Sequence, residues 1–312
     1  MKRENIKLQK PEFVFKNGKL TPWDDAVLHI GCEGVNRGLN VFEGIKGYWQ
    51  KNGRFGIVEL HEHFKRLQRS AKLLLIPFDM SYEDYKKNVF LLIGTLIDRD
   101  RDMWCRTTLF VVEGHWGVGT EADLVITAYH QDKEMPESIN LGFSSWQRST
   151  DNSLPTRIKT STNYQVGRLA RVEGRNRDCQ DMILLNQQGR VAETTGSCVL
   201  IVRDGVIYTP PSTESALESI TLDIIEKLAI SSNIPFVRRP IDRTEVLIAD
   251  EISICGTLSE LVPIESIDGN EVDPNGPIFS LLRKNFFDIV RGETKSSDIE
   301  FEFIPERYIK NK

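Results

Sequence analysis

The chain has 312 residues, a formal net charge of −5 and a composition of 40% hydrophobic and 27% charged residues. These values are typical of a folded globular protein and exclude a disordered chain, and no apolar run approaches the roughly 20 residues that span a membrane. The basic residues are scattered along the chain, which argues against nucleic acid as a partner.

The cysteines and the N-terminal segment bear on the cellular compartment. The five cysteines are odd in number and form no CxxC pair, which is expected of reduced thiols. Residues 1–10 mix charges with isolated apolar side chains and lack the apolar centre of a signal peptide. We therefore expect a cytoplasmic protein.

The length exceeds that of a usual single domain and predicts two packed domains. The polar stretch 131–136 is the best linker candidate. We accordingly expect a small N-terminal domain over residues 1–131, a linker over 132–137 and a larger C-terminal domain over 138–312.

Two segments near the N-terminus have clear local signals. Residues 12–20 predict a β-hairpin, because Asn17 and Gly18 accept the positive φ angles of a type I′ turn. Residues 31–47 contain too many glycines for a helix interior and match no nucleotide-binding fingerprint. We expect a loop there that leads into a strand.

The remaining elements follow from periodicity and turn residues. Apolar residues at helical spacing, and in one case a capping serine at position 81, predict helices at 60–75, 82–97, 163–175, 219–231 and 277–290. Short apolar runs between turn residues predict strands at 105–113, 122–128, 139–145, 182–209 as a meander, 235–239 and 251–255. The polar tail after Gly292 is expected to be mobile.

A metal site is not expected. His61 and His63 flank a glutamate, but the spacing is not that of the HExxH zinc motif and no further ligands are evident.

Six motifs, in order along the chain, together carry a family resemblance. They are Val41-Phe-Glu-Gly-Ile45, Glu62-His-Phe-Lys-Arg-Leu67, Pro155-Thr-Arg-Ile-Lys159 with Asn163-Tyr164, Val191-Ala-Glu193, Ser219-Ile-Thr221 and Cys255-Gly-Thr-Leu-Ser-Glu-Leu-Val-Pro263. Any one of them is weak evidence. In this order and at these separations, the chain resembles the fold-type IV pyridoxal-phosphate enzymes, in particular the branched-chain amino acid aminotransferases, from about Phe13 to about Arg291.

The resemblance implies a fold class and an activity. The fold would be α+β, similar to that of D-amino acid aminotransferase, with a small N-terminal α/β domain and a larger C-terminal β-rich domain with helices. The activity would be transamination between an amino acid and a 2-oxo acid with pyridoxal 5′-phosphate. The family works as homodimers, so we expect a homodimer.

The resemblance also assigns residues to the cofactor. Lys159 would be the covalent anchor of the aldehyde and the base that moves the substrate proton, although a lone lysine is more often simply solvated. Glu193 would keep the pyridine nitrogen protonated, since a carboxylate beside that nitrogen raises its proton affinity. Tyr164 would lie near the phenolate oxygen. The phosphate would be bound by a guanidinium, a helix N-terminus and a turn, namely Arg66, Ser219, Ile220, Thr221 and Thr257.

Substrate contacts are expected from a second set of residues. Arg106 matches an arginine that binds a distal carboxylate, and Phe42 matches an aromatic residue of the pocket. Arg37 replaces a usual tyrosine, and Arg157 occupies a position where small residues are common. The full expected set is Arg37, Phe42, Arg106, Arg157, Thr257 and Leu258.

The altered pocket leaves the substrate open. Branched-chain L-amino acids are the default, and the arginines together with two shortened loops, 114–123 and 129–140, favour a polar or acidic partner. A D-amino acid aminotransferase or an aminodeoxychorismate lyase of the same fold is an alternative. A non-catalytic binding protein is a further one, disfavoured because Lys159, Glu193 and Arg66 are all present.

Overall fold

The computed structural model describes residues 9–310, which form two compact units: residues 9–134 with 300–310, and residues 135–299. Residues 1–8, most of the N-terminal segment that lacks the apolar centre of a signal peptide, lie outside the described part. Residues 300–310 were expected in the C-terminal domain, and the structure corrects this assignment. They belong to the first unit because Phe301–Phe303 pairs antiparallel with an N-terminal strand.

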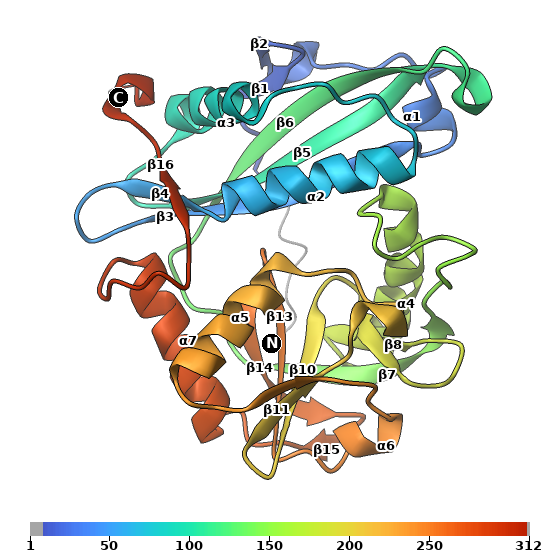
Figure 1. Ribbon diagram of the computed structural model, residues 1–312, viewed down its shortest axis with the longest axis vertical. Helices are drawn as coiled ribbons and strands as arrows, with labels where there is room; N and C mark the ends of the chain where they lie inside the picture. Colours follow the sequence, from blue (N-terminus) through green and yellow to red (C-terminus); the bar gives the residue numbers. More distant parts are fainter. Residues whose placement is uncertain (1–8, 311–312) are drawn as a thin grey trace. The chain divides into compact units, whose positions relative to one another are not determined.

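The first unit is built on a seven-stranded sheet in which all neighbours are antiparallel (Figure 1). Its strand order is β16-β4-β3-β5-β6-β1-β2. The strands are β1 (Phe13–Lys16), β2 (Lys19–Pro22), β3 (Asn40–Trp49), β4 (Phe55–Val58), β5 (Asp102–Glu113), β6 (Glu121–Gln131) and β16 (Phe301–Phe303).

Two long helices pack on this sheet, α2 (Leu60–Leu73) on β3 and α3 (Tyr82–Leu96) on β1 and β6. The cap predicted for α3 is confirmed, since Ser81 Oγ accepts a hydrogen bond from the Asp84 N–H at 3.1 Å. The shorter helices of this unit are α1 (Glu33–Asn36), η1 (Trp23–Asp25), η2 (His115–Gly117) and η5 (Glu306–Tyr308).

The predicted hairpin and the predicted loop at 31–47 have different outcomes. The hairpin is confirmed, with φ angles of 44° at Asn17 and 85° at Gly18 between β1 and β2. In the glycine-rich segment the chain forms the single helical turn α1 before β3 begins at Asn40. The interpretation as a loop leading into a strand therefore missed one turn of helix.

The second unit contains a nine-stranded mixed sheet of order β12-β11-β10-β13-β14-β7-β8-β9, with β15 paired to β14. The pairs β11–β12, β14–β7 and β7–β8 are parallel and the others are antiparallel. The strands are β7 (Ile139–Gln147), β8 (Asp181–Leu185), β9 (Val191–Thr194), β10 (Cys198–Arg203), β11 (Val206–Thr209), β12 (Phe236–Arg238), β13 (Glu251–Gly256), β14 (Glu260–Ile267) and β15 (Asn270–Glu271).

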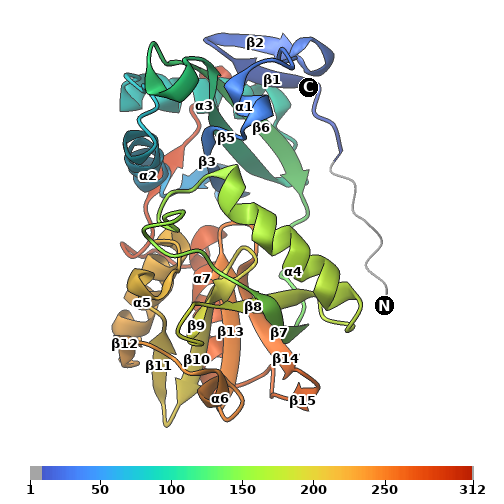
Figure 2. The same ribbon diagram turned by 90° about the vertical axis from the view of Figure 1, so that its right-hand side faces the viewer.

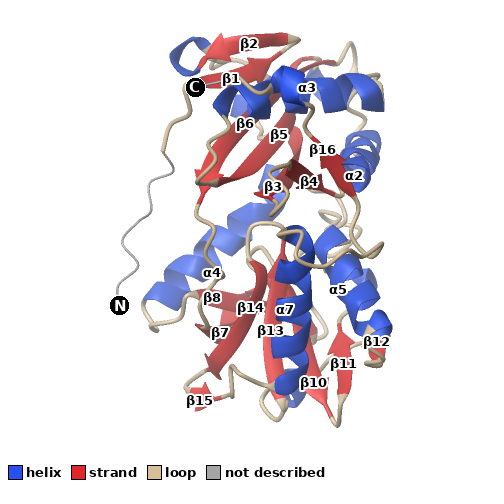
Figure 3. Cartoon of the chain, turned by 90° about the vertical axis from the view of Figure 1, so that its left-hand side faces the viewer, coloured by secondary structure: helices blue, strands red, loops and turns tan. Residues whose placement is uncertain are grey.

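Helices flank this sheet. Helix α4 (Gln165–Arg175) packs on β7 and β8 (Figure 2). Helices α5 (Ile220–Ser231) and α7 (Pro277–Val290) lie side by side and contact β13 (Figure 3). The short helices are α6 (Arg243–Val246), η3 (Ser161–Tyr164) and η4 (Ser212–Glu214).

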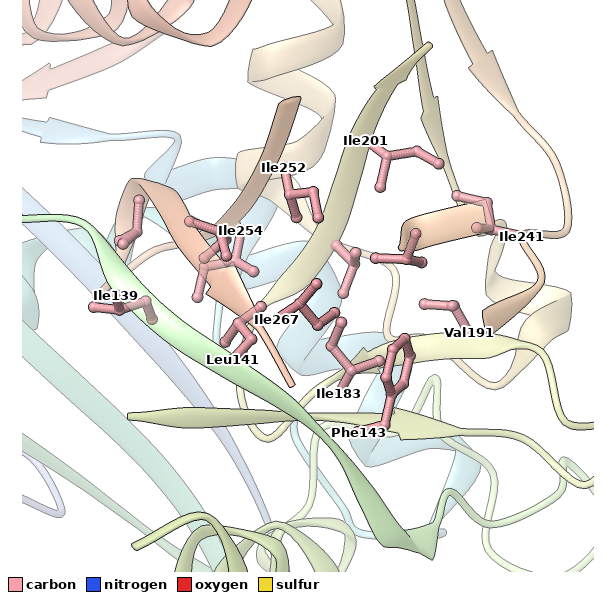
Figure 4. Close-up of a cluster of buried hydrophobic side chains, with 14 residues drawn as sticks. Ile139, Leu141, Phe143, Ile183, Val191, Ile201, Ile241, Ile252, Ile254 and Ile267 are labelled. Atoms are coloured by element: carbon pink, nitrogen blue, oxygen red, sulfur yellow. The ribbon is translucent and has the colours of Figure 1, made fainter. Parts of the chain in front are cut away.

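The core of the second unit is a cluster of buried, mostly β-branched side chains from the sheet, from α6 and from the connection before α6 (Figure 4). Ile183, Ile201, Ile254 and Ile264 are each at most 2% exposed. Branched aliphatic side chains pack well against a pleated surface. This core fixes the strands whose ends carry the candidate functional residues.

Among residues 9–310, no helix has the length and the apolar character needed to cross a membrane. The five cysteines are all free thiols, and four of them are buried.

Candidate active site

Lys159 lies in the connection between β7 and η3. Its Nζ donates a hydrogen bond to Tyr164 Oη at 3.0 Å. The buried Asn163 shapes this connection, because its Nδ2 donates to the carbonyls of Pro155 and Ile158, both at 2.9 Å. The amine and the phenol predicted for the cofactor are thus neighbours, held by a compact turn.

Glu193 lies on β9 with only 7% of its surface exposed. Its Oε1 is 2.6 Å from Nη2 of Arg148, and its Oε2 accepts a hydrogen bond from the Leu217 N–H at 3.2 Å. A buried carboxylate with two partners has a fixed orientation. Glu193 is therefore a rigid acceptor.

Arg148 is a residue that sequence reasoning missed. It is 6% exposed, and its Nη1 donates to the carbonyl oxygen of Asn163 at 2.9 Å while Nε donates to that of Ser215 at 3.4 Å. One guanidinium thus joins Glu193, the Lys159–Tyr164 segment and the loop before α5. No motif marked Arg148, since it precedes Lys159 by eleven positions and resembles any arginine that follows a strand.

The N-terminus of α5 contains three of the predicted phosphate residues. Ser219 is the N-cap, and its Oγ accepts a hydrogen bond from the Leu222 N–H at 3.2 Å. Ile220 and Thr221 open the helix and are buried. The first N–H groups of a helix have no intrahelical acceptor and lie at the positive end of its dipole, which favours an anion.

Thr257 and Leu258 lie in the tight connection between β13 and β14, where Gly256 pairs with Glu260. Gly256 is closely packed, since an added Cβ would lie 3.0 Å from Ser259 Oγ. Leu258 is 49% exposed. The turn is thus held firmly at its base, while the Leu258 side chain reaches solvent.

Arg66 belongs to the first unit, where it forms a buried network with Glu43 and His63. Its Nε and Nη2 donate to the two carboxylate oxygens of Glu43 at 2.7 and 2.8 Å, and Nδ1 of His63 lies 2.7 Å from Glu43 Oε2. Burial raises the pKa of Glu43, but the charge and hydrogen bonds of Arg66 and His63 outweigh it and lower that pKa to about 2. Glu43 is therefore an anion at any physiological pH.

Arg106 and Phe42 also belong to the first unit. They lie on the neighbouring strands β5 and β3, and the guanidinium carbon of Arg106 is 3.8 Å from the centroid of the Phe42 ring. This distance is that of a cation–π contact. The two predicted substrate residues are thus in direct contact.

The other two predicted substrate arginines lie against carboxylates of their own units. Arg37 forms an ion pair with Glu33 and stacks on Trp116, 5.0 Å from the ring centroid. Arg157 donates to Glu218 at 2.7 Å. Their charges are therefore balanced internally.

The structure brings part of the predicted set together. The second unit contains Lys159, Tyr164 and Glu193, joined through Arg148, and also Arg157 and the segments 219–221 and 257–258. The first unit contains the remaining candidates, Arg37, Phe42, Arg66 and Arg106.

Comparison with known proteins decides the family. Residues 40–267 match the model of the amino-transferase class IV family. The chain belongs to this family. The branched-chain-amino-acid aminotransferase of Escherichia coli K12 is 31% identical over 307 residues, covering 92% of this chain and 96% of that protein.

Solved aminotransferase structures agree. A crystal structure of the E. coli branched-chain amino acid aminotransferase superposes with a TM-score of 0.87 at 31% identity, covering 92% of this chain and 97% of that chain. The pyridoxal-phosphate form of the Thermobaculum terrenum enzyme gives a TM-score of 0.84 at 32% identity and covers 96% of this chain and 97% of that chain. The predicted fold class, a fold-type IV α+β enzyme, is confirmed, and this aminotransferase is a branched-chain-aminotransferase-like enzyme dependent on pyridoxal phosphate.

The side chains of the aminotransferase suit that cofactor. The cofactor offers an aldehyde, a phenolate oxygen, a ring nitrogen and a phosphate. The second unit alone provides an amine, a phenol, a fixed buried carboxylate and a helix N-terminus. The chemistry of the donor set therefore fits pyridoxal phosphate.

Proposed function

We propose that this transaminase exchanges an amino group between an amino acid and a 2-oxo acid with Lys159 as its catalytic base. The observation that carries the proposal is Arg148, which links Glu193 to the segment of Lys159 and Tyr164. When bound, pyridoxal phosphate supplies the aldehyde that receives the amino group and a ring that withdraws electrons from the substrate carbon.

The side chains around Lys159 have distinct proposed roles. Lys159 Nζ anchors the cofactor and, once displaced by substrate, moves the proton at the substrate carbon. Glu193 holds the proton on the ring nitrogen. Tyr164 Oη, 3.0 Å from Lys159 Nζ, orients the amine and would lie near the phenolate oxygen of the bound cofactor.

The phosphate is assigned to donors of three kinds. Arg66 provides a planar guanidinium, which suits a dianion. Ser219, Ile220 and Thr221 provide the N-terminus of α5, and Thr257 provides the hydroxyl of the β13–β14 turn.

For the substrate, branched-chain L-amino acids are the default, and the relatives' names support branched-chain amino acids without specifying the enantiomer. Arg106 is proposed to bind the distal carboxylate of an acidic partner, with Phe42 as the apolar part of the pocket. Arg37 and Arg157 are proposed to alter the pocket in favour of a polar partner, and Thr257 and Leu258 are proposed to contact the substrate. Because Arg37 and Arg157 already pair with Glu33 and Glu218, an acidic substrate would have to compete with these carboxylates.

The protein is further proposed to be a cytoplasmic homodimer, with the chain at 132–137 as the linker between its domains. The five free thiols are consistent with a reducing compartment. Large apolar side chains of the first unit that are more than half exposed, as in an interface, are Val27, Ile30, Val35, Leu73, Leu75, Trp116 and Val118. Sedimentation velocity should give twice the chain mass, and Val118→Asp should shift the protein toward the monomer. A monomeric wild type would contradict the proposal.

The proposed catalytic role is tested by looking for covalent attachment of the cofactor to Lys159. The purified protein should be yellow, and borohydride reduction should fix the mass of the cofactor on the peptide that contains Lys159. Protein that stays colourless with added pyridoxal phosphate would instead support a non-catalytic binding protein.

The substrate class is tested with half-reactions. Absorbance changes across a panel of amino acids, with both enantiomers, should show leucine, isoleucine and valine reacting and acidic or polar amino acids competing well with them. A plain preference for the branched-chain amino acids would remove the roles given to Arg37 and Arg157. Reaction with D-enantiomers would favour a D-amino acid aminotransferase, and pyruvate release from aminodeoxychorismate would favour the lyase.

A further inference from the structure

Glu43 has no role in the transaminase described so far, yet its carboxylate is fully buried in an ion pair of the first unit. It lies on β3 and is 0% exposed, and it meets Arg66 and His63 on one face of α2, where the two are three positions apart. The two oxygens of Glu43 accept three hydrogen bonds of 2.7–2.8 Å. A buried charge with three partners is fixed in position.

The pattern of these bonds determines how the guanidinium is oriented. Glu43 binds the edge of Arg66 that is formed by Nε and Nη2. A guanidinium is planar, so a fork on one edge fixes both its plane and the direction of the opposite edge, which contains Nη1. The orientation of Arg66 is therefore set by Glu43 and not by the flexible arginine side chain.

His63 in turn fixes Glu43. The Glu43 carboxyl remains ionised down to about pH 2, so its oxygens can only accept hydrogen bonds. Nδ1 of His63 must therefore carry the hydrogen of the 2.7 Å contact. Glu43 thus has a donor on each side, and neither oxygen can rotate without losing one.

We propose that Glu43 and His63 are positioning residues that hold Arg66 in the orientation in which it binds the cofactor phosphate. This inference rests on the phosphate role proposed for Arg66. Because the charge of Glu43 cancels that of Arg66, the preference of Arg66 for a ligand with a phosphate would come from the orientation of its N–H groups and not from net charge.

Geometry and charge make opposite predictions for Glu43→Gln. Removing an anion near a phosphate would strengthen binding if charge alone mattered. The glutamine amide, however, would place its NH2 group against the N–H donors of Arg66 or His63, so the fork is lost and the guanidinium turns away. We expect pyridoxal phosphate to bind at least about 10-fold more weakly, the usual effect of losing one charge-assisted hydrogen bond.

The test compares pyridoxal phosphate with pyridoxal, which lacks the phosphate, by titrating the cofactor-free full-length chain and following absorbance. In Glu43→Gln, the affinity for pyridoxal phosphate should fall by at least about 10-fold, whereas the affinity for pyridoxal should change by less than about 3-fold. Glu245→Gln is a matched control, because Glu245 forms a comparable fork with Arg239 in the second unit. It should leave the affinity for both ligands unchanged.

The outcomes separate this inference from the proposed function. If Arg66→Met has no selective effect on pyridoxal phosphate, the phosphate role of Arg66 fails and the inference fails with it. Suppose instead that Arg66→Met lowers the affinity for pyridoxal phosphate selectively. Only the inference is then overturned if Glu43→Gln leaves that affinity unchanged, raises it, or lowers the affinities for both ligands equally. Arg66→Lys keeps the charge without the fork and should be nearly as weak as Arg66→Met.

A second pair of variants covers the case in which Glu43→Gln does not fold. His63→Met removes the donor to Glu43, and His63→Gln supplies a new one. His63→Met should lower the affinity for pyridoxal phosphate, but not for pyridoxal, by several-fold. His63→Gln should keep most of the wild-type affinity. Equal affinities in the two variants would overturn the positioning role.

Discussion

Arg148 and Arg66 are both buried arginines that pair with a buried glutamate, yet they relate to the cofactor in opposite ways. Arg66 is itself the residue proposed to bind the phosphate, and Glu43 orients it. At the other site Glu193 is proposed to bind the ring nitrogen, and Arg148 orients it. In each case one partner of an ion pair is a recognition group and the other is its support.

The support given by Arg148 leads to a first prediction. Arg148→Met leaves Glu193 buried without its cation, which should cost about 3–5 kcal/mol of stability. In the protein that remains folded, the shifted carboxylate should slow the amino acid half-reaction by about 100-fold. Stopped-flow absorbance measures this rate. The rate of Arg148→Lys should lie between those of wild type and Arg148→Met.

Further variants separate an effect on stability from an effect on Glu193. Arg190→Met leaves Glu214 without its fork, so it should lose stability with little change in the half-reaction rate. Glu193→Gln should keep the cofactor bound and lose most of the rate, and adding Arg148→Met to it should slow the reaction little further, since both act through one carboxylate. A wild-type rate in folded Arg148→Met would remove Arg148 from the mechanism.

At the residue scale, sequence motifs mark candidate ligand-binding groups but do not show which side chains support them. Lys159, Glu193 and Arg66 lie in recognisable motifs, and their assignments stay predictions until cofactor binding is measured. Arg148 and His63 gain their meaning from partners 45 and 20 positions away, at Glu193 and Glu43. Such contacts depend on strand order and helix packing, which local patterns do not specify.

At the scale of elements, the N-terminus of helix α7 is capped by a side chain from strand β13. The carboxylate of Glu251 on β13 accepts hydrogen bonds from the N–H groups of Ile278 and Phe279 at 3.0 and 2.8 Å. Gly276 allows this approach, since a Cβ there would lie 2.2 Å from the Glu251 side chain. The sequence predicted the helix but not this cap.

The cap predicts a stability effect without a cofactor effect. Glu251→Gln replaces one acceptor by a donor, so one buried N–H of α7 loses its partner, at a cost of about 1–3 kcal/mol. Urea unfolding measures the loss, and the affinity for pyridoxal phosphate should stay within about 2-fold of wild type. Gly276→Ala should show the same pattern because it displaces the same carboxylate. A selective loss of cofactor affinity in either variant would contradict the structural role.

Elements with clear local signals were predicted, whereas strand β16, which has only a distant partner to indicate it, was not. The β1–β2 hairpin and the capped helix α3 have their turn and cap residues in sequence, and both were found. Strand β16 lies in a polar tail that was expected to be mobile, and its pairing with β4 joins residues that are more than 240 positions apart. This expectation was wrong because no local pattern reveals such a partner.

Strand β16 predicts the effect of a truncation. Ending the chain at Ile299 would uncover the edge of β4 and remove Phe303, whose ring packs on the Arg54 guanidinium at 3.7 Å. An uncovered apolar edge lowers stability and promotes aggregation. Thermal unfolding should begin at least about 5 °C lower, with increased light scattering. Phe303→Ala should give a smaller shift in the same direction, and an unchanged melting curve of the truncated chain would contradict the role of β16.

At the scale of the whole molecule, buried ionisable groups set the pH range of stability. The pKa values of several carboxyls are lowered by cationic or hydrogen-bonding partners, as for Glu173 in the second unit, where burial opposes hydrogen bonds from Ser144 and Ser145 and the charge of Arg177. Burial raises the pKa of the Cys105 thiol and keeps it neutral. The carboxyls lose their stabilising contribution in acid, and the buried thiol lowers stability only in base, where the unfolded chain ionises and the folded chain does not.

Glu43 dominates the acid side in the first unit and gives the last prediction. Its pKa falls from 4.5 to about 2 on folding, so the stabilisation is complete above about pH 4.5 and disappears as the pH falls toward 2. The shift corresponds to about 3 kcal/mol. Wild type should therefore exceed Glu43→Gln in the free energy of unfolding by an amount that shrinks by about that much between pH 6 and pH 2. Urea unfolding followed by tryptophan fluorescence suits this measurement, because four of the five tryptophans, at positions 23, 49, 104 and 116, lie in the first unit. A difference that stays constant with pH would mean that the Glu43 carboxyl titrates alike in the folded and unfolded chains, which the buried contacts with Arg66 and His63 should prevent.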